Sequence, residues 1–255
     1  MKIIVIYPDR FAKHSLGDFG RNLIDYSKTK ENIEHDFTFM PIVNGGTLSE
    51  MESVVNLLSP AFHPIISESK GLTQVLLDGY RKLVSLHADH GAIHDTSMIV
   101  RMDTNEHPIE LITALVELSR GNLAIYGRKL DGENASVEEI NANNFLWPKT
   151  YEAFTNERLS LSNTHGFQAF DVKTLENILP VVEKIIFETE AIIGEKLFWG
   201  MDAIMALAAV SQRLYSGQFF YYINEMRSRP KEKIDEQFRN HINLLIVARK
   251  ILFAN

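Results

Sequence analysis

The sequence predicts an α/β fold in which a mostly parallel central sheet is flanked by helices, with a more helical C-terminal part. Three observations lead to this prediction. Short apolar runs alternate with segments of helical length through the first half of the chain. These runs are continuously apolar, as expected for parallel strands that are buried on both faces. In the second half, apolar residues recur mainly at helical spacing.

The elements of the first half follow from hydrophobic patterning and turn residues. Apolar runs predict strands at residues 2–7, 37–43, 64–66, 97–102 and 122–127. Helical spacing predicts helices between them, at residues 16–27, 49–58, 71–86 and 109–119. Ser49 is the expected N-terminal cap of the second helix. Pro108 stands near the first position of the fourth helix, where its missing amide hydrogen is not needed.

The second half is predicted to be mainly helical. Helices are expected at residues 172–193, 201–215 and 235–252, and a strand is expected at residues 219–223. Pro180 lies inside the first of these helices and is expected to kink or break it. The first and last helices could serve a homo-oligomer interface as easily as a core.

Composition and net charge exclude several classes of function for this protein. The chain of 255 residues is 45% hydrophobic, which is enough for one large core. Its net charge of −7 argues against broad nucleic-acid binding, which requires a basic surface. The absence of cysteine excludes disulfides and thiolate chemistry and is compatible with a cytoplasmic location. No stretch approaches the roughly 18 apolar residues of a transmembrane helix, although peripheral membrane contact stays open.

Each predicted strand of the first half ends in polar or glycine-rich residues. Ligands bind beyond the carboxyl ends of parallel strands, so these residues are expected to converge. They are Tyr7-Pro8-Asp9, Asn44-Gly45-Gly46, Ser67-Glu68-Ser69-Lys70, Asp103-Thr104-Asn105 and Gly127-Arg128. Asp103 and Asn105 offer the hard oxygen ligands that Mg²⁺ and Mn²⁺ prefer. The alternative is that Asp103 or Asn105 caps the helix that begins near Pro108.

Five motifs follow one another along the chain. They are Gly71 with Gly79, Asp103-Thr104-Asn105-Glu106-His107-Pro108, Tyr126-Gly127-Arg128, Gly166-Phe167-Gln168-Ala169-Phe170, and Arg227-Ser228-Arg229 with Lys233. Their order resembles that of the family 2 glycosyltransferases of the GT-A fold, and most closely that of the polyprenol-phosphate mannose synthases. In that family they correspond to a glycine-rich helix start, a D-x-D run before His-Pro, a G-x-R segment, an acceptor-side segment and a basic loop over the phosphates.

The resemblance implies a metal-dependent glycosyltransferase that moves a sugar from a GDP- or UDP-linked donor to an acceptor such as a lipid phosphate or a saccharide. Mn²⁺ or Mg²⁺ would be held by Asp103, Asn105 and His107. Asp202 stands where the family often carries an acid and would be the general base of an inverting enzyme. The rival roles of Asp202 are helix capping and a favourable position at the positive end of the helix dipole.

The resemblance also implies a set of residues that bind the nucleotide sugar. They are Tyr7, Asp9, Asn44, Lys70, Gly71, Asp103, Arg128, Arg227, Arg229 and Lys233. The alternative for Tyr7 and Asp9 is an ordinary turn after the strand, and that for Asn44 is a left-handed turn position. For Lys70 and the basic loop the alternative is simple solvation.

Two departures from the family pattern motivate a second function. The second strand ends in Asn44-Gly45-Gly46-Thr47 where the family carries two aspartates, and Asn105 replaces the second acid of the D-x-D run. The alternative is a catalytically degenerate member that binds a nucleotide, a sugar or a protein partner without turnover. In either case the resemblance implies a single domain over residues 1–255, with a nucleotide-sugar half at 1–130, an acceptor half at 131–235 and a C-terminal helix at 236–255.

Overall fold

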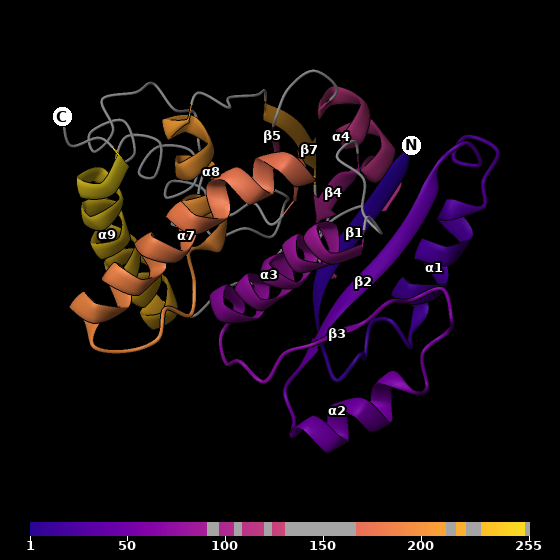
Figure 1. Cartoon of the computed structure of the whole chain (residues 1–255), viewed down its shortest axis with the longest axis horizontal. Coiled ribbons are helices and arrows are strands. Elements are labelled where there is room, and N and C mark those ends of the chain that lie inside the picture. Colours follow the sequence, from indigo (N-terminus) through magenta and orange to yellow (C-terminus); the bar gives the residue numbers. More distant parts are fainter. Residues whose placement is uncertain are drawn as a thin grey trace.

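The chain folds around one central sheet with helices on both faces (Figure 1). The structure is a computed structural model that describes residues 1–90, 97–104, 109–119, 124–130, 167–212, 218–222 and 231–252. Within these residues the strands are β1 (Lys2–Arg10), β2 (Asp36–Asn44), β3 (Ile65–Ile66), β4 (Met98–Arg101), β5 (Ala124–Leu130), β6 (Gln168–Asp171) and β7 (Gln218–Tyr222). The helices are α1 (Asp18–Ser27), α2 (Leu48–Val55), α3 (Leu72–His90), the 3₁₀ turn η1 (Ile109–Leu111), α4 (Ile112–Ser119), α7 (Val172–Ile193), α8 (Met201–Ser211) and α9 (Lys231–Leu252).

The described strands form one sheet in the order β3-β2-β1-β4-β6-β5-β7. All neighbours from β3 to β4 pair in parallel, and so do β5 and β7. β6 runs antiparallel to both β4 and β5. The predicted mostly parallel sheet is therefore confirmed. The sequence pattern did not reveal β6 as a strand, because four residues are too few to establish a periodicity.

A hydrophobic core lies on each face of the sheet. In β1, Ile4 and Ile6 belong to one core, whereas Ile3 and Val5 belong to the other, and all four are fully buried. Side chains of a strand alternate between faces, so burial on both faces requires a continuously apolar strand. Helices α3, α7, α8 and α9 contribute to the first core, and α1 and α4 contribute to the second (Figure 1).

Of the helices of the second half, α7 has the predicted bounds, whereas α8 and α9 each differ from the sequence prediction at one end. α7 is continuous from Val172 to Ile193 with Pro180 inside it, so Pro180 does not break this helix, and the kink stays a prediction. The backbone N–H of Thr174 donates to Asp171 at 2.6 Å, which caps the start of α7. α9 begins at Lys231, earlier than the predicted start at residue 235. Lys233 is therefore part of a helix rather than of a loop.

Thr47, and not Ser49, caps the second helix. The Thr47 hydroxyl accepts from the backbone N–H of Glu50, and the Glu50 carboxylate accepts from the Thr47 backbone N–H and hydroxyl, both at 2.8 Å. This reciprocal pair is a capping box. The prediction of Ser49 as the cap is wrong, because Ser49 already lies inside α2. These hydrogen bonds, from the Thr47 backbone first and its hydroxyl second, lower the pKa of Glu50 below 4.5.

Replacing Thr47 with alanine is expected to lower the free energy of unfolding by about 1 kcal/mol, the usual contribution of a threonine cap. Because the pKa of Glu50 is lowered in the folded state, its ionisation favours folding above about pH 4.5, and this contribution disappears as the pH falls through the lowered pKa. The difference between Thr47→Ala and the parent should therefore shrink at pH 3. Urea unfolding at pH 7 and pH 3 measures both values, and Ser49→Ala is the control that should change little. Equal losses in the two variants would contradict the assignment of the cap.

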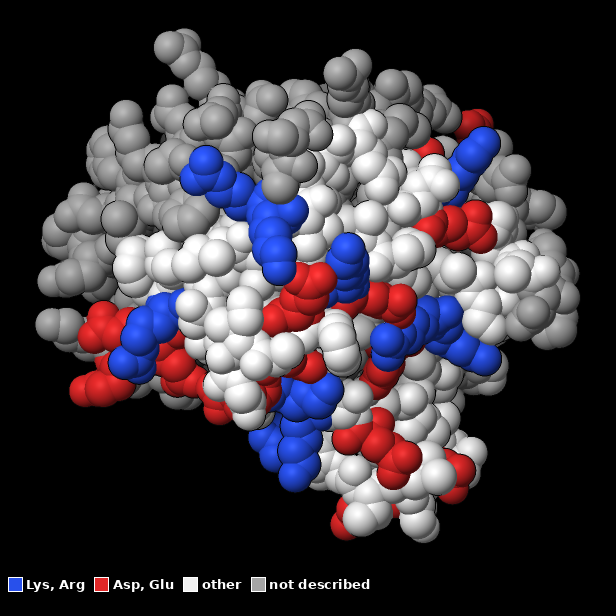
Figure 2. Space-filling view, turned by 60° about the vertical axis from the view of Figure 1, so that its left-hand side comes forward, with Lys and Arg blue, Asp and Glu red and all other residues white. Residues whose placement is uncertain are grey.

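Charges of both signs share the surface of the described residues. On the face that Figure 2 shows, basic and acidic side chains are interspersed. One ion pair of this kind joins Arg81 of α3 to Glu183 of α7 at 2.6 Å. Within the described part of the chain, no helix combines the length and the apolar character that crossing a membrane requires.

Candidate functional site

A fully buried arginine lies at the carboxyl end of the central strand β4. Arg101 is the last residue of β4, and its side chain is 0% exposed. In the sheet it stands beside Ile6 of β1 and Gln168 of β6. An arginine is almost never fully buried without paired charges, because its cation loses the solvation that water provides. The fold must therefore supply negatively charged partners for Arg101 at this end of β4.

Two aspartates hold the guanidinium of Arg101. Nη2 donates to Oδ1 of Asp103 at 2.8 Å, and Nη1 donates to Oδ1 of Asp202 at 2.7 Å. Asp103 follows directly after β4, whereas Asp202 lies in the first turn of α8, 101 residues beyond Arg101. The Asp103 and Asp202 side chains are 24% and 21% exposed. The buried guanidinium of Arg101 thus binds two carboxylates that are partly exposed to solvent.

The guanidinium of Arg101 stays charged in this setting. Burial by itself would lower the pKa of Arg101, but the charges of Asp103 and Asp202 raise it, and the net shift is upward. The first turn of α8 also places the positive end of the helix dipole near the Asp202 carboxylate. With both carboxylates ionised, two negative charges and one positive charge give the cluster a net charge of −1.

Polar and aromatic side chains enclose the charged cluster. Nε2 of Gln168 donates to the backbone carbonyl of Asp202 at 3.2 Å, which ties β6 to the start of α8. The Tyr80 ring packs edge-on against Phe170 at 5.7 Å, and burial raises the pKa of Tyr80 well above 10. Within the described residues, Nε of Arg101, Oε1 of Gln168 and the Tyr80 hydroxyl have no hydrogen-bond partner. The environment of Arg101 is therefore polar on several sides although it is closed to solvent.

Sequence reasoning missed Arg101 and Gln168. The signal for Arg101 was present, because a charged residue closes the apolar run Met98-Ile99-Val100 and the strand is buried. A buried arginine requires carboxylate partners, and Asp103 stands two residues away. Gln168 stands in the motif from Gly166 to Phe170, but its place beside Arg101 depends on the antiparallel pairing of β6 with β4.

Asp103 is the member of the predicted metal set that the structure describes. Its carboxylate pairs with Arg101, and the following α-helix starts only at Ile112 after the 3₁₀ turn at Ile109. Residues 105–108, which precede this turn, lie outside the described residues, so the alternative that Asp103 or Asn105 caps the helix stays a prediction. Asn105 and His107 lie outside the described residues.

The predicted basic residues are only partly placed. The backbone of Arg128 lies in β5, opposite Phe220 of β7. Lys233 lies in the first turn of α9. Arg227 and Arg229 lie outside the described residues. Whether these four residues meet a phosphate thus stays a prediction.

Tyr7 and Asp9 support the turn that follows β1. The Asp9 carboxylate accepts from the His14 N–H at 2.9 Å, from the Ser15 N–H at 2.8 Å and from the Ser15 hydroxyl at 2.5 Å. The Tyr7 hydroxyl shares a hydrogen bond of 2.9 Å with the Ser15 hydroxyl. Both side chains are fully buried. The structure therefore gives Tyr7 and Asp9 the turn-holding role that was the alternative to nucleotide binding.

Asn44 ends β2 beside this turn. Its carbonyl accepts from the Phe11 N–H at 2.9 Å. The left-handed residue here is Gly45, with φ +103°, and not Asn44, so the alternative role proposed for Asn44 is wrong. Phe11 and Ala12 also have positive φ, at 55° and 49°, which is unusual for residues with a side chain. This strained turn leaves the Phe11 ring 39% exposed at the end of the sheet.

Lys70 and Gly71 connect β3 to α3. Lys70 is exposed, and Gly71 has φ +87°. A Cβ atom at Gly71 would lie 3.0 Å from the Phe198 ring and 3.1 Å from its Cα. The Thr73 N–H also donates to the Phe198 carbonyl at 3.1 Å. Gly71 thus permits a close approach by the protein's own segment before Asp202.

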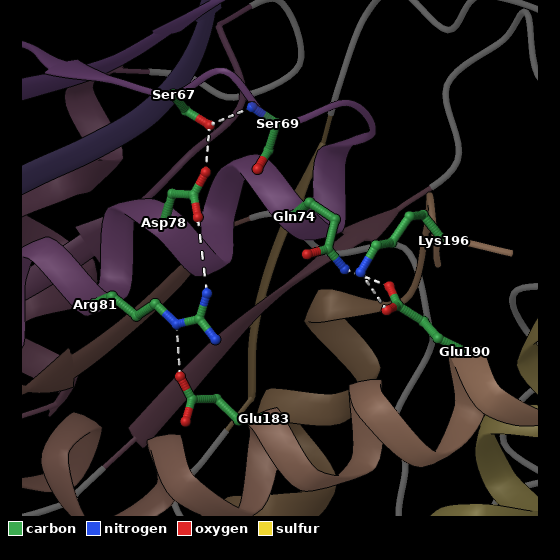
Figure 3. A network of polar contacts seen from close by, with 8 residues as sticks. All are labelled: Ser67, Ser69, Gln74, Asp78, Arg81, Glu183, Glu190 and Lys196. Carbon is green, nitrogen blue, oxygen red and sulfur yellow. Dashed lines mark hydrogen bonds and ion pairs between the residues drawn. The ribbon is translucent and has the colours of Figure 1, made fainter.

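Polar contacts hold that segment in place (Figure 3). Glu190, near the end of α7, accepts from Gln74 of α3 at 2.5 Å. The same carboxylate accepts from the Leu197 N–H at 3.0 Å and from Lys196 at 2.9 Å. Since residues 196–197 lie a few residues before the start of α8 at Met201, these bonds fix the part of the chain that precedes Asp202.

A second chain of contacts starts from the loop after β3. The Ser67 hydroxyl donates to Asp78 at 2.5 Å, and Arg81 lies 3.9 Å from the other oxygen of Asp78 (Figure 3). Arg81 also donates to Glu183 of α7 at 2.6 Å. The loop before Lys70 is therefore connected through α3 to α7.

The residues at the end of β4 fit a divalent cation that shares its coordination with a ligand. Mg²⁺ and Mn²⁺ sites of this kind use one or two carboxylates together with substrate phosphates. Asp103 supplies such a carboxylate, partly exposed and next to Asp202. Among the described residues, no group of three or more His, Asp and Glu side chains could hold a metal alone. The donor set suits a cation that phosphate oxygens help to bind.

Comparison with known proteins identifies the fold. No protein-family model and no curated protein sequence matches the chain. The structure is similar to that of glucosyl-3-phosphoglycerate synthase from Mycobacterium tuberculosis in complex with Mn²⁺, uridine diphosphate and phosphoglyceric acid. The TM-score is 0.65 at 11% identity, and the match covers 98% of this chain and 79% of the synthase.

Two further solved structures show the same likeness. A mycobacterial protein has a TM-score of 0.62 at 11% identity, over 98% of this chain and 75% of that one. Another structure of the Mycobacterium tuberculosis synthase has a TM-score of 0.57 at 12% identity, over 98% and 81%. Identities this low establish the fold alone. The chain has the GT-A, Rossmann-like fold of nucleotide-diphospho-sugar transferases.

Proposed function

We propose that this protein is a metal-dependent glycosyltransferase that moves a sugar from a nucleotide-diphosphate sugar to an acceptor. The observation that carries the proposal is the meeting of Asp103 and Asp202 on Arg101 at the carboxyl end of β4. In open α/β sheets this end of the strands is where ligands bind. The GT-A fold supports the same conclusion, since it is shared with a synthase whose structure contains Mn²⁺ and uridine diphosphate.

Asp103 is the proposed ligand on the donor side. Mn²⁺ or Mg²⁺ bound there would neutralise the charge that develops on the departing nucleoside diphosphate. Asn105 and His107 are proposed as further ligands, and Lys70, Arg128, Arg227, Arg229 and Lys233 as cations for the phosphates. The donor is proposed to be GDP- or UDP-linked.

Asp202 is the proposed general base on the acceptor side. A carboxylate that accepts the acceptor proton is what an inverting transfer requires. Trp199, three residues before Asp202 in the chain, is 36% exposed, and Phe198 is 45% exposed. Exposed aromatic faces beside a base suit the apolar face of a sugar ring or a lipid chain. We propose a saccharide or a lipid phosphate as the acceptor, the latter by likeness to polyprenol-phosphate mannose synthases.

We also propose that different segments of the chain bind the donor and the acceptor. Residues 1–130 would form the donor half, residues 131–235 the acceptor half and residues 236–255 a C-terminal helix. Asp103 and Asp202 then come from different halves. Transfer would depend on the contact between these halves at Arg101.

A thermal-shift screen of the purified protein tests the proposal. GDP, UDP, CDP, dTDP and their sugar conjugates are each added with and without Mn²⁺ or Mg²⁺. A ligand that binds the native state raises the melting temperature by mass action. We expect one base to raise it clearly, and only when metal is present. The sugar conjugate of that base is then assayed for transfer or slow hydrolysis.

The outcomes separate enzyme from binding protein. Binding with donor hydrolysis supports the glycosyltransferase. Binding without hydrolysis, under every metal and acceptor tried, favours the degenerate member that Asn44-Gly45-Gly46 suggests. No shift with any nucleotide contradicts a nucleotide-sugar site altogether.

A further inference from the structure

Arg101 binds both Asp103 and Asp202, which have different roles in the proposed function. Asp103 would face the donor phosphates and Asp202 the acceptor, yet both carboxylates bind one guanidinium at 2.8 and 2.7 Å. We propose that Arg101 is a positioning residue that couples the two sides, fixing Asp103 relative to Asp202 and weakening cation binding at Asp103 until a nucleotide diphosphate is present. This inference rests on the proposed function.

The shape of the guanidinium accounts for the positioning. Its two Nη atoms lie in one rigid plane, so each carboxylate is held by a separate donor in a fixed direction. Arg101 itself is 0% exposed and lies in the sheet between Ile6 and Gln168. It therefore has little freedom to move. A lysine at this position would offer a single point charge and could not hold both carboxylates in one plane.

The charge of Arg101 accounts for the weakened cation binding. A divalent cation at Asp103 would approach a guanidinium that already contacts the same carboxylate. Like charges a few ångströms apart repel, and partial burial limits the screening by water and salt. A nucleoside diphosphate brings negative charge that offsets this repulsion. Metal and nucleotide should therefore bind with positive coupling, each strengthening the other.

The neighbours of Arg101 and of Asp202 hold this arrangement in place. Arg101 is 0% exposed and lies in the sheet beside Ile6 and Gln168. The Gln168 bond to the Asp202 carbonyl and the Glu190 bond to the Leu197 N–H hold the start of α8 from the other side. The coupling is thus built into the folded protein.

The decisive measurement is Mn²⁺ affinity without nucleotide, followed by electron paramagnetic resonance or calorimetry. Arg101→Met removes the charge and is expected to bind Mn²⁺ about tenfold more tightly than the parent. The gain in Mn²⁺ affinity on adding the nucleoside diphosphate should shrink by the same factor. kcat should fall at least tenfold because Asp202 is no longer aligned. Arg81→Met is the matched control, since Arg81 pairs with Glu183 at a half-exposed site and should change neither quantity.

A purely structural role for Arg101 gives a different result. Lost packing would lower the melting temperature and weaken Mn²⁺ binding, so unchanged or weaker binding in folded Arg101→Met overturns the proposal. Arg101→Lys keeps the charge: it should retain the parent Mn²⁺ affinity and lose kcat. Full activity of Arg101→Lys would overturn the positioning role.

A third variant keeps the test decisive if substitutions at Arg101 prevent folding. Asp202→Asn retains the charge of Arg101 and removes one of the two carboxylates that offset it. Mn²⁺ at Asp103 should therefore meet stronger repulsion and bind several-fold more weakly without nucleotide. Unchanged Mn²⁺ affinity in Asp202→Asn would overturn the proposal. If the parent protein binds neither Mn²⁺ nor a nucleotide, the proposed function fails. If the parent binds both but the variants do not shift the coupling, only this inference fails.

Discussion

Replacing Asp103 with alanine is expected to abolish the metal-dependent binding of a nucleoside diphosphate and to lower kcat/KM by at least a hundredfold. The reason is that Asp103 supplies the proposed metal carboxylate at the end of β4, and loss of one group that stabilises transition-state charge commonly costs this much. The protein should still fold, because Asp202 continues to pair with the buried Arg101. Calorimetry with and without Mn²⁺ measures binding, and donor hydrolysis measures turnover.

Two further variants make the Asp103 result specific. Asp103→Asn keeps an oxygen for the Arg101 N–H but removes the charge, so it should fold like the parent and bind Mn²⁺ weakly. Asp18→Ala is the control, because Asp18 forms an exposed pair with Arg21 in the first turn of α1. Parent-like binding and turnover in Asp103→Ala would show that the donor phosphates and their metal are held elsewhere.

Replacing Asp202 with asparagine is expected to lower kcat by 10²- to 10⁴-fold, the usual contribution of a general base. Asparagine keeps a carbonyl oxygen to accept from Nη1 of Arg101 but cannot take a proton at neutral pH. The KM for the donor, measured with saturating metal, should change less than tenfold. Loss of kcat without loss of donor binding is the signature of a group that acts mainly in the transition state.

The control for Asp202 is Glu183→Gln on α7. Glu183 pairs with Arg81 in the surface network of Figure 3, and its neutralisation should leave kcat within a factor of two. If Asp202→Asn loses donor hydrolysis and transfer in equal measure, Asp202 serves the donor rather than the acceptor. If it keeps the parent kcat, the general base is a different residue.

Several features of the fold could be predicted from the sequence because they depend on neighbours along the chain. The continuous apolar runs identified the strands β1 to β5 and β7, and helical spacing identified the main helices. The sequence predictions differ from the structure where two neighbouring residues could each fill the same role, or where a residue that disfavours a helix lies inside one. The pattern predicts Ser49 as a cap, although Thr47 forms the capping box with Glu50. It also predicts a kink or a break at Pro180, and α7 does not break there.

The candidate site was predictable only in its separate parts. Asp103 was identified from its position after a buried strand, and Asp202 from a likeness to a family motif. Their contact through Arg101 was not, because Arg101 and Asp202 are 101 residues apart and meet only when the fold brings the start of α8 to the end of β4. The hydrogen bonds of Tyr7 and Asp9 to Ser15 are also invisible in a strand pattern.

The sequence by itself determined the α/β class, the mostly parallel sheet and the acidic end of β4, because hydrophobic periodicity and strand burial are local properties of the chain. Only the tertiary structure decided that β6 enters the sheet antiparallel and brings Gln168 beside Arg101. It also decided that one buried guanidinium holds Asp103 and Asp202 together. A buried cation needs carboxylates from wherever the fold can supply them, and that requirement acts across space rather than along the chain.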